Sequence, residues 1–208
     1  MSKTALVRTA PVQQRSAERV NALLDAAAQL LDEHGIDALT TSEVSKRAHS
    51  SVGVIYRYFP HIESLLHGLA ARNFEKYLAA LSTRLELKAD NAIAALNTAV
   101  DVYLDLCRSE AGFRVLSFGN MIDRSAESGQ PSVNAEMAEI FRDMLVSTYD
   151  VHDSEALAFD IEVSVGIAES LLERAFLHDP DGDQAFIDKL RELVAQLLAP
   201  HMKDAPTA

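Results

Sequence analysis

The sequence contains little glycine, proline and cysteine. Eight glycines and six prolines among 208 residues are about half the usual share, so turns are few, which argues against a many-stranded β fold and favours helices. The single cysteine, Cys107, excludes a disulfide framework within the chain and fits a reducing compartment. The first residues lack the apolar segment of a secretory signal, and no apolar run approaches about 20 residues. We therefore expect a soluble cytoplasmic protein that does not span a membrane.

Acidic residues outnumber basic residues in the chain. There are 31 Asp and Glu against 19 Lys and Arg, which gives a formal net charge of −12. Proteins that bind nucleic acid usually carry a basic patch, so the total charge by itself argues against DNA binding. The charge is unevenly distributed, however. Residues 1–70 hold 7 basic and 7 acidic residues, whereas residues 71–208 hold 12 basic and 24 acidic residues, so the whole excess lies in the second segment.

Apolar residues recur at intervals of three and four along most of the chain, which is the period of amphipathic helices. There is no strand pattern, internal repeat or low-complexity segment, and we predict an all-α fold. The helices are expected at residues 15–34, 41–48, 51–58, 61–85, 91–108, 112–121, 133–149, 154–177 and 183–199. We expect a flexible arm at residues 1–14 and a loop at residues 122–132. Gly35 is placed to end the first long helix, with Ile36 making the apolar contact that often follows.

Residues 40–65 are expected to contain two short helices joined by a tight turn. Thr40 and Glu43 have the spacing of a capping box, which starts a helix. Residues 49–51 are a turn signal, and Pro60 disfavours the helical conformation at the residue before it. Two short helices with this spacing, preceded by a supporting first helix, follow the helix-turn-helix plan.

This segment also resembles the signature of a known family, the tetracycline-repressor-type (TetR) regulators. The resemblance is carried by residues 40–66, TTSEVSKRAHSSVGVIYRYFPHIESLL. The matching residues are Thr40, Val44, Ala48, Ser51, Gly53, Ile55, Tyr56, Tyr58, Phe59, Pro60, Glu63 and Leu65. Gly35 and the preceding amphipathic helix also match, so the resemblance covers roughly residues 15–70, and the rest of the chain matches in length and helix order.

The resemblance implies an all-α homodimer with two domains per chain. The N-terminal domain would consist of three helices and bind a double-stranded DNA operator. The larger C-terminal domain would hold a pocket for a small-molecule effector and pair its last two helices with those of a second subunit. Usually such a protein represses transcription until a small molecule binds. We expect the DNA-binding domain at residues 15–61, the effector-binding and dimerisation domain at residues 62–200 and a tail at residues 201–208.

Residues 52–58 would form the recognition helix. Gly53 allows the backbone to approach DNA closely, and Arg57 can reach a guanine edge or a phosphate. Hydroxyl groups would donate hydrogen bonds to phosphates, which fix register rather than sequence. Ile55 and Phe59 should instead point into the small core. The residues expected at DNA are Thr41, Ser42, Ser51, Val52, Gly53, Tyr56, Arg57, Tyr58 and His61.

Three positions depart from the family pattern. His49 stands where the family usually has a glycine, and it would cost on the order of 1–2 kcal/mol if that site needs a positive φ. Ser45 replaces a small alanine. Ile62 replaces a lysine that often contacts phosphate, for which His61 would substitute weakly. These departures motivate an alternative function, a helical ligand-binding or interaction module that has lost DNA binding.

The last two predicted helices are rich in apolar residues. The first of them is apolar on nearly all sides through its middle, which is typical of a helix buried on more than one face. We expect the two to form an antiparallel pair within a dimer bundle, with the core of a monomer as the alternative. The residues expected at the dimer interface are Ile161, Val165, Gly166, Ala168, Leu172, Leu190, Val194 and Leu197.

Aromatic and sulfur-containing side chains are the candidates for the effector pocket, because they fall on helices that the family packs around its ligand. Such residues at helical spacing are more often plain core. The candidates are Tyr103, Cys107, Phe113, Phe118, Met121, Phe141, Met144 and Phe159. Cys107 could alternatively be a redox sensor, although a lone cysteine among apolar residues is more often a buried small hydrophobe.

Polar residues of the C-terminal segment have several interpretations. Asn97, Asp101 and Asp105 form a stripe at intervals of four, which we expect to face solvent. Glu162 and Glu169 lie seven residues apart within an apolar helix. They could face solvent, pair across the dimer, or bind a cationic effector.

The sequence carries no catalytic or cofactor-binding pattern. The seven histidines show no metal-ligand spacing, and there is no phosphate-binding loop, dinucleotide fingerprint or nucleophile elbow. We therefore expect no cofactor and no metal, and an α-helical enzyme is a third, weaker hypothesis. The prediction is a dimeric, ligand-responsive transcriptional regulator, by resemblance a repressor, that binds a palindromic operator. Because residues 1–70 are neutral, binding should depend modestly on salt and rely on specific contacts.

Overall fold

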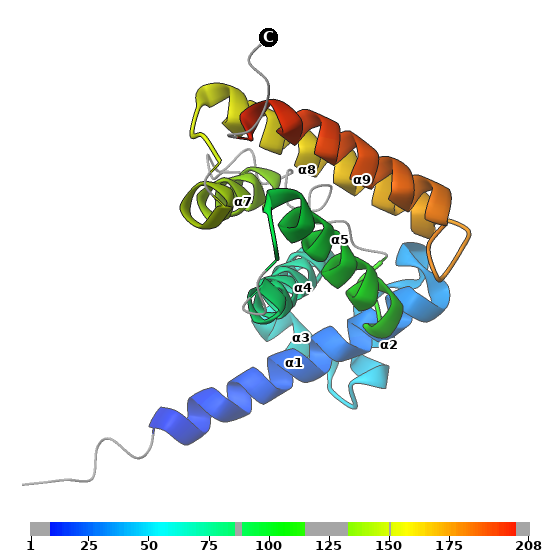
Figure 1. Cartoon of the computed structure of the whole chain (residues 1–208). Helices are drawn as coiled ribbons and strands as arrows, with labels where there is room; N and C mark the ends of the chain where they lie inside the picture. The colour runs from blue at the N-terminus through cyan, green and yellow to red at the C-terminus, as the bar shows by residue number, and fades with distance from the viewer. Residues whose placement is uncertain (1–8, 86–88, 115–132, 150, 203–208) are drawn as a thin grey trace, which may run out of the picture. The chain divides into compact units, whose positions relative to one another are not determined.

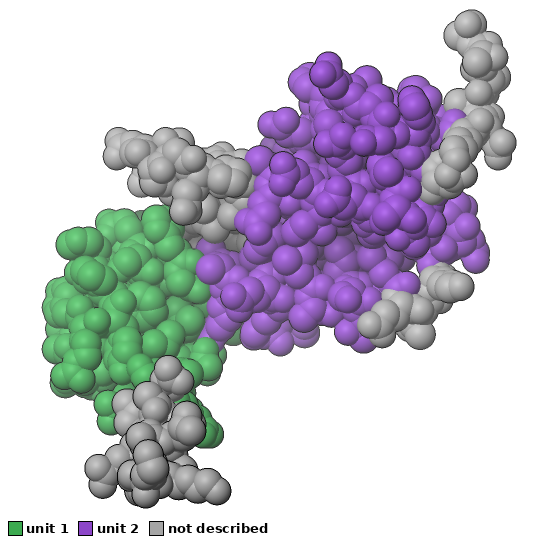
Figure 2. Space-filling view, turned by 90° about the vertical axis from the view of Figure 1, so that its left-hand side faces the viewer, with its two compact units in different colours: residues 1–69, 111–115 green, residues 70–110, 116–208 purple. Residues whose placement is uncertain are grey.

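The computed structural model of the chain describes residues 9–85, 89–114, 133–149 and 151–202. These residues form eight α-helices and two short 3-10 helices, without a strand (Figure 1), which confirms the all-α prediction. Within the described ranges, no helix combines the length and the apolar character that crossing a bilayer requires. The chain divides into two compact units, coloured separately in Figure 2. Unit 1 comprises residues 1–69 and 111–115, and unit 2 comprises residues 70–110 and 116–208.

The first helix, α1 (Thr9–His34), begins earlier than predicted. Pro11 is its third residue. The N–H groups of the first turn have no acceptor within a helix, so a proline there removes no hydrogen bond. The arm predicted over residues 1–14 is therefore wrong for residues 9–14, and residues 1–8 lie outside the described residues.

Gly35 ends α1, as predicted, with φ of 75° and ψ of −178°. This combination is accessible essentially to glycine alone. The extended ψ leads the chain away from the helix into the 3-10 helix η1 (Ile36–Ala38). Ile36, which was expected to make an apolar contact after the helix, is 47% exposed and therefore does not belong to the buried core.

Unit 1 packs α1, α2 (Thr41–Arg47), α3 (Val52–Tyr58) and the beginning of α4 (Ile62–Leu85) around one core. Each of these helices contributes side chains that are at most 1% exposed. They are Leu23, Ala27, Leu31, Val44, Ile55, Leu65 and Leu69. The limits of α2, α3 and α4 agree with the predicted ones to within one residue, because a side-chain cap at Thr40 and Pro60 mark them locally.

A short turn from later in the chain completes unit 1. Phe113 is fully buried there, and Arg114 pairs with Asp32 of α1 at 3.2 Å. Gly112 has φ of 71°, and a Cβ at this position would lie 2.8 Å from the Cα of Ala28. Glycine is thus required both by the backbone conformation and by the close approach to α1.

The boundary between the units falls inside α4, between residues 69 and 70, rather than at residue 61. The first turns of α4 belong to unit 1 because Leu65 and Leu69 are fully buried. Gly68 adds a close contact, since a Cβ there would come within 2.9 Å of the Phe59 ring.

Unit 2 contains the remainder of α4 together with α5 (Ala92–Ser109), α7 (Val133–Tyr149), α8 (Glu155–Phe176) and α9 (Gln184–Leu198), followed by η3 (Ala199–His201). The helix limits again lie within one residue of those predicted, and α5, α8 and α9 each begin at a side-chain cap. Helices α8 and α9 pack side by side as the expected antiparallel pair (Figure 1). The helix predicted at residues 112–121 and the loop at 122–132 lie outside the described residues, apart from a turn at 111–114.

Candidate DNA-binding and ligand-binding sites

The helix-turn-helix of unit 1 begins with a capped α2. The Thr40 hydroxyl accepts a hydrogen bond from the Glu43 backbone N–H at 3.2 Å, as the capping-box spacing predicted. Thr41 and Ser42 then form the first turn of α2, where Thr41 is half-buried and Ser42 is exposed. Inside the helix, buried Ser45 is satisfied because its hydroxyl donates to the Ser42 carbonyl at 2.8 Å.

The turn between α2 and α3 is a Schellman motif centred on His49. The Ser50 N–H donates to the Ser45 carbonyl at 2.9 Å, and the His49 N–H donates to the Lys46 carbonyl at 3.3 Å. His49 has φ of 48° and is the one non-glycine residue with positive φ within the described ranges. The position therefore does need the left-handed conformation, and histidine tolerates it at some cost.

Helix α3 has one buried and one exposed face. Ile55 is fully buried and Phe59, just after the helix, is 8% exposed, as predicted. On the other face Val52 is 38% exposed and Tyr56 is 52% exposed. Gly53 and Arg57 are also exposed. A Cβ at Gly53 would meet only the Ser51 hydroxyl, at 4.0 Å, so packing within the chain does not require glycine at this position.

Two side chains of the helix-turn-helix are held by α1. The Tyr58 hydroxyl accepts a hydrogen bond from Ser16 at 3.2 Å, and this bond, with smaller effects of Arg19 and Arg57, lowers the pKa of Tyr58. Arg47 forms a bidentate pair with Glu33, with distances of 2.7 and 2.6 Å. Both contacts tie α2 and α3 to α1, so they position the exposed face of α3.

A cavity with a volume of about 90 Å³ lies in unit 2. Its walls come from α4, α5, α7, α8 and α9, and they are almost entirely apolar. The lining residues are Tyr77, Leu96, Ala99, Val100, Tyr103, Asn134, Met137, Phe141, Ile161, Ser164, Val165, Ala168, Glu169, Leu172, Val194 and Leu198. Tyr77 and Tyr103 meet edge to face, with ring centroids 6.1 Å apart.

Few polar groups reach the cavity. Glu169 accepts a hydrogen bond from the Asn134 amide at 2.8 Å. The Tyr77 hydroxyl donates to the Ala99 carbonyl at 3.3 Å, and burial raises the pKa of Tyr77. Burial also raises the pKa of Tyr103 well above its ordinary value, and Cys107 and the carboxylate of Glu169 raise it further.

Two known family models match the chain, one over the helix-turn-helix and one over the segment that holds the cavity. Residues 23–69 match the family described as bacterial regulatory proteins, tetR family. Residues 90–202, more than half of the chain, match the tetracyclin repressor-like, C-terminal domain. The chain belongs to the TetR family. It is thus a member of a family of transcriptional regulators rather than of enzymes.

Individual relatives of this TetR-family chain are also bacterial regulators. A TetR-family transcriptional regulator from Streptomyces coelicolor has 32% identity, covers 88% of this chain and 99% of its own, and superimposes with a TM-score of 0.73. The transcriptional repressor KstR of Rhodococcus jostii is 41% identical over 59 residues, which are 28% of each chain. KstR of Mycolicibacterium smegmatis is 35% identical over 81 residues, so the match spans 36% of that relative.

A further solved structure, of RolR in complex with resorcinol, covers 94% of this chain and 98% of its own. Its TM-score is 0.60 at 19% identity, which shows a shared fold.

The residues predicted for DNA binding in this TetR-family chain lie together in unit 1. Val52, Gly53, Tyr56 and Arg57 are on the exposed side of α3. His61 is exposed just before α4, where its N–H and carbonyl both bond the Ser64 hydroxyl. The match over residues 23–69 and the intact turn argue against the alternative that DNA binding has been lost. His49 is accommodated by the turn, although it stands in place of glycine.

The predicted pocket residues of this regulator are only partly brought together. Tyr103 and Phe141 line the cavity, and Cys107 is buried beside Tyr103. The other three described candidates do not line it: Phe113 is in the core of unit 1, Met144 is half-buried on α7, and Phe159 is 66% exposed. Phe118 and Met121 lie outside the described residues.

The prediction missed Tyr77, Met137, Asn134 and the inner face of α8. Spacing alone could not find the inner face of α8, because that helix is apolar on several faces. Tyr77 on α4 and the two residues on α7 reach the cavity through tertiary packing, which local spacing does not show.

The predicted dimer interface also requires a correction, because most of its residues lie on the inner rather than the outer side of α8 and α9. Its buried members face the interior of the single chain, where α8 packs against α9, and all of them except Leu190 line the cavity. These are Ile161, Val165, Leu172, Leu190 and Val194, which are 0–9% exposed, and Ala168 also lines the cavity. Gly166 and Leu197 are the members that are neither buried nor part of the cavity wall. Around Gly166 no atom lies within 4 Å of a Cβ position.

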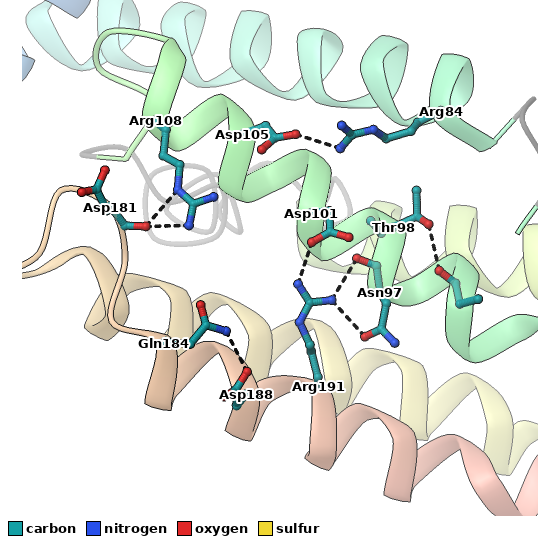
Figure 3. Close-up of polar contacts among 12 residues, drawn as sticks. Arg84, Asn97, Thr98, Asp101, Asp105, Arg108, Asp181, Gln184, Asp188 and Arg191 are labelled. Atoms are coloured by element: carbon teal, nitrogen blue, oxygen red, sulfur yellow. Dashed lines mark hydrogen bonds and ion pairs between the residues drawn. The ribbon is translucent and has the colours of Figure 1, made fainter.

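In the stripe Asn97, Asp101 and Asp105, the two aspartates are exposed, as predicted, and all three side chains also make contacts with other helices. Figure 3 shows Arg191 of α9 reaching α5, where it donates to Asn97 Oδ1 at 3.2 Å and to Asp101 at 2.7 Å. Asp105 pairs with Arg84 of α4 at 2.8 Å. The stripe is a polar seam that joins α5 to two neighbouring helices, a role that its spacing could not reveal because both partners are distant in sequence.

Of the two glutamates on α8, Glu162 is exposed and Glu169 lines the cavity. They lie seven residues apart, but only Glu169 is turned toward α7, as its bond to Asn134 shows.

Proposed function

We propose that the chain is a homodimeric repressor that binds a palindromic operator through α3 and is released by a small-molecule effector. The observation that carries this proposal is the exposed face of α3. Val52 and Tyr56 are 38% and 52% exposed, while Ile55 between them is fully buried. The core of unit 1 therefore does not account for these two side chains. An apolar and an aromatic side chain suit contacts with thymine methyl groups and the sugar-phosphate backbone.

The remaining exposed groups have complementary roles in this proposal. Arg57 would read a guanine edge, because its guanidinium matches the two acceptors of that base. Gly53 would let the backbone of α3 approach DNA closely. Hydroxyl and imidazole groups at the starts of α2 and α3, at the end of α3 and just after it would bind phosphates and fix the register. These are Thr41, Ser42, Ser51, Tyr58 and His61.

The dimer contact is assigned to the outer face of α8 and α9. Phe159 is 66% exposed, and Val163, Gly166 and Ile167 follow on the same side of α8 without being buried. On α9, the corresponding half-buried residues include Leu193 and Leu197. An apolar face of this kind on two packed helices is suited to a four-helix bundle with a second copy.

The cavity of unit 2 is the proposed effector site. Ligands favour concave, mostly apolar sites with a few polar groups, and the lining of this cavity has that character. The similar fold of RolR holds resorcinol, which supports a small-molecule role. To switch occupancy of the operator, the effector must discriminate between two states of the dimer by roughly several kcal/mol.

The operator proposal is tested by selecting bound duplexes from a random DNA library with the full chain. We expect an inverted repeat whose half-site centres lie about 34–36 Å apart or somewhat further, since each recognition helix enters one major groove. A gel shift with the DNA upstream of the chain's own gene is the second assay. Failure of both assays to yield a bound palindrome would overturn the proposal.

The dimer proposal is tested with Gly166→Glu. The variant should fold, because a side chain at this position meets no atom of its own chain within 4 Å of Cβ. In sedimentation it should be monomeric at concentrations where the parent chain is dimeric. The control is Glu139→Gln, which alters an exposed residue of α7, outside the proposed face of α8 and α9. A variant that sediments like the parent dimer would exclude this face.

A further inference from the structure

Unit 1 has a cleft between α1 and the turn that joins α2 to α3, and we refer to it as the α1–turn cleft. Its volume is about 340 Å³. The polar residues that line it are Arg19, His49, Ser50 and Ser51. Among the described residues of its wall none is acidic, and the guanidinium of Arg19 is always charged. A cationic group and several hydrogen-bond donors therefore face one concave surface, which suits an anionic partner.

His49 is held in a conformation that costs free energy. Its φ is 48°, a region that glycine enters without strain. The side chain is exposed and lines the α1–turn cleft, so packing in the core of unit 1 does not account for a histidine here. Strained residues often serve a function, and the inference runs from the observed strain to that function. The imidazole at the cleft is the part of His49 that can have one.

Arg19 is positioned beside Tyr58. After the bond from Ser16, a hydrogen bond and the charge of Arg19 contribute to the lowered pKa of Tyr58. A guanidinium has five N–H donors, so this contact leaves others for a further acceptor. Val54, one turn before Tyr58 on α3, also lines the α1–turn cleft. Arg19 therefore lies along the side of α3 that faces α1.

The α1–turn cleft borders the start of the proposed recognition helix. Ser51 directly precedes α3, and its hydroxyl does not cap the helix. The next residues, Val52 and Gly53, are exposed. Residues at the start of a recognition helix contact base edges in the major groove, and the sugar-phosphate backbone forms the rim of that groove. Donors beside the start of α3 would therefore lie near DNA phosphates.

We propose that the α1–turn cleft binds one phosphate of the DNA backbone in each half-site, with Arg19 as the cation and His49 as a second hydrogen-bond donor. The proposal rests on the operator function proposed above and extends it to two residues outside α3. An imidazole donates an N–H whether it is neutral or protonated, and a bond to a phosphate is charge-assisted. The histidine that departs from the family pattern then contributes to DNA binding.

The test measures the affinity of the full chain for the selected operator and for an unrelated duplex of the same length, by fluorescence anisotropy at several salt concentrations. Arg19→Gln should weaken both complexes by about threefold to tenfold. It should also reduce the slope of log affinity against log salt by about 1 for each subunit. Both duplexes should respond, because a phosphate contact carries no sequence information.

Two further variants of this kind separate charge from structure. Arg142→Gln removes the same charge from an exposed pair on α7 in unit 2, and it should bind both duplexes like the parent chain. Arg19→Lys keeps the charge, so it should keep most of the salt slope, which preserves the test if the glutamine variant does not fold.

His49→Gly removes the imidazole and relieves the strain of the turn. It should weaken both complexes by about threefold while the protein is at least as stable as the parent chain in thermal unfolding. Weaker binding by a protein that is not less stable distinguishes a contact with DNA from a structural role of the side chain.

Operator duplexes with a single methylphosphonate, which removes the charge of one phosphate, locate the contact. At one position in each half-site the neutral linkage should weaken binding by the parent chain and leave the affinity of Arg19→Gln unchanged. Parental affinity of either Arg19→Gln or His49→Gly would overturn the proposal, and so would a weaker Arg19→Gln variant with a parental salt slope and no such position.

The outcomes also separate this proposal from the operator function. A selected palindrome that both variants bind like the parent overturns the phosphate contact and leaves the repressor standing. If no palindrome is selected but both variants bind the unrelated duplex more weakly than the parent, the operator falls and the phosphate contact stands. A chain that binds neither duplex overturns both.

Discussion

The two units of the chain differ in how their interiors are filled. In unit 1, Leu23, Val44, Ile55 and Leu65 meet in a core where each is at most 1% exposed. In unit 2, the helices surround a cavity of about 90 Å³, and Arg191 and its partners join them at a polar seam. A closely packed core holds α3 in one position, as reading a DNA sequence requires. An incompletely filled interior leaves room for a ligand to stabilise one arrangement of helices over another.

The N-terminal and C-terminal segments of the chain also differ in charge. Residues 1–70 are neutral, with 7 basic and 7 acidic residues, whereas residues 71–208 carry the whole net charge of −12. The acidic segment would repel DNA and so suppress non-specific binding. The overall charge of a chain is thus a poor guide to DNA binding when its two segments have different tasks.

The largest expected effect is on stability, and it tests the difference in packing between the core of unit 1 and the cavity wall of unit 2. Leu65→Ala, in the core of unit 1, should lower the free energy of unfolding by about 2–5 kcal/mol, because it leaves a new cavity. Leu96→Ala, on the wall of the existing cavity, should cost about 1 kcal/mol less, because Leu96 already lacks neighbours on one side. Denaturant unfolding monitored with a probe in each unit measures both. Equal losses would show that the units do not differ in packing.

The next largest effect is on the affinity for the operator. Arg57→Ala should weaken binding to the selected operator by about 1–3 kcal/mol if the side chain reads a base, with helicity and dimerisation unchanged. Gel shifts at several salt concentrations distinguish a base from a phosphate contact, since loss of a phosphate contact reduces the salt dependence. Arg142→Ala is the control: it removes the same charge from an exposed pair with Asp153 in unit 2. Unchanged operator affinity would remove Arg57 from the interface.

A smaller effect should follow from the turn of unit 1. His49→Gly should raise the free energy of unfolding by about 1 kcal/mol or less. Glycine relieves the strain of φ at 48°, and its greater freedom in the unfolded chain offsets part of the gain. Thermal unfolding measures the change, with Ser50→Gly as a control that removes a neighbouring side chain. A less stable His49→Gly variant would mean that histidine makes a stabilising contact.

The smallest effect is the pH dependence of the link between α1 and α2. The hydrogen bonds from Arg47 hold the pKa of Glu33 below its ordinary value of 4.5. The contribution of this pair to stability is therefore complete above that value and is lost as the pH falls through the lower pKa of the folded chain. Glu33→Gln should show a flatter dependence of stability on pH below about 4.5, and Arg47→Ala should show the same flattening. An unchanged slope in both would mean that the pair does not form in solution.

Much of the fold could be predicted from the sequence, because the residues that start and end its helices act on their near neighbours in the chain. The Thr40 cap, Pro60 and the breaker before α9 act on residues within one or two turns, and the helix limits they mark agree with the structure. The start of α1 differs from the prediction, because the helix includes Pro11 and the first turn of a helix tolerates proline.

The candidate sites were predicted unequally. The buried and exposed sides of α3 followed from its short sequence, in which Ile55 and Phe59 are spaced to face the core together. The cavity was predicted less well. Phe159 is exposed while Ile161 is buried, although both lie on an apolar stretch of α8, and no periodicity separates faces that are all apolar.

The sequence by itself determined the helices, their limits and the helix-turn-helix, because helix formation depends on capping and on the period of apolar residues. Only the tertiary structure decided which face of α8 meets the cavity, where α4 passes from one unit to the other, and which partners Asn97, Asp101 and Asp105 take. Those features depend on neighbours distant in the chain, as Arg191 is from Asp101, and local patterns do not encode such partners.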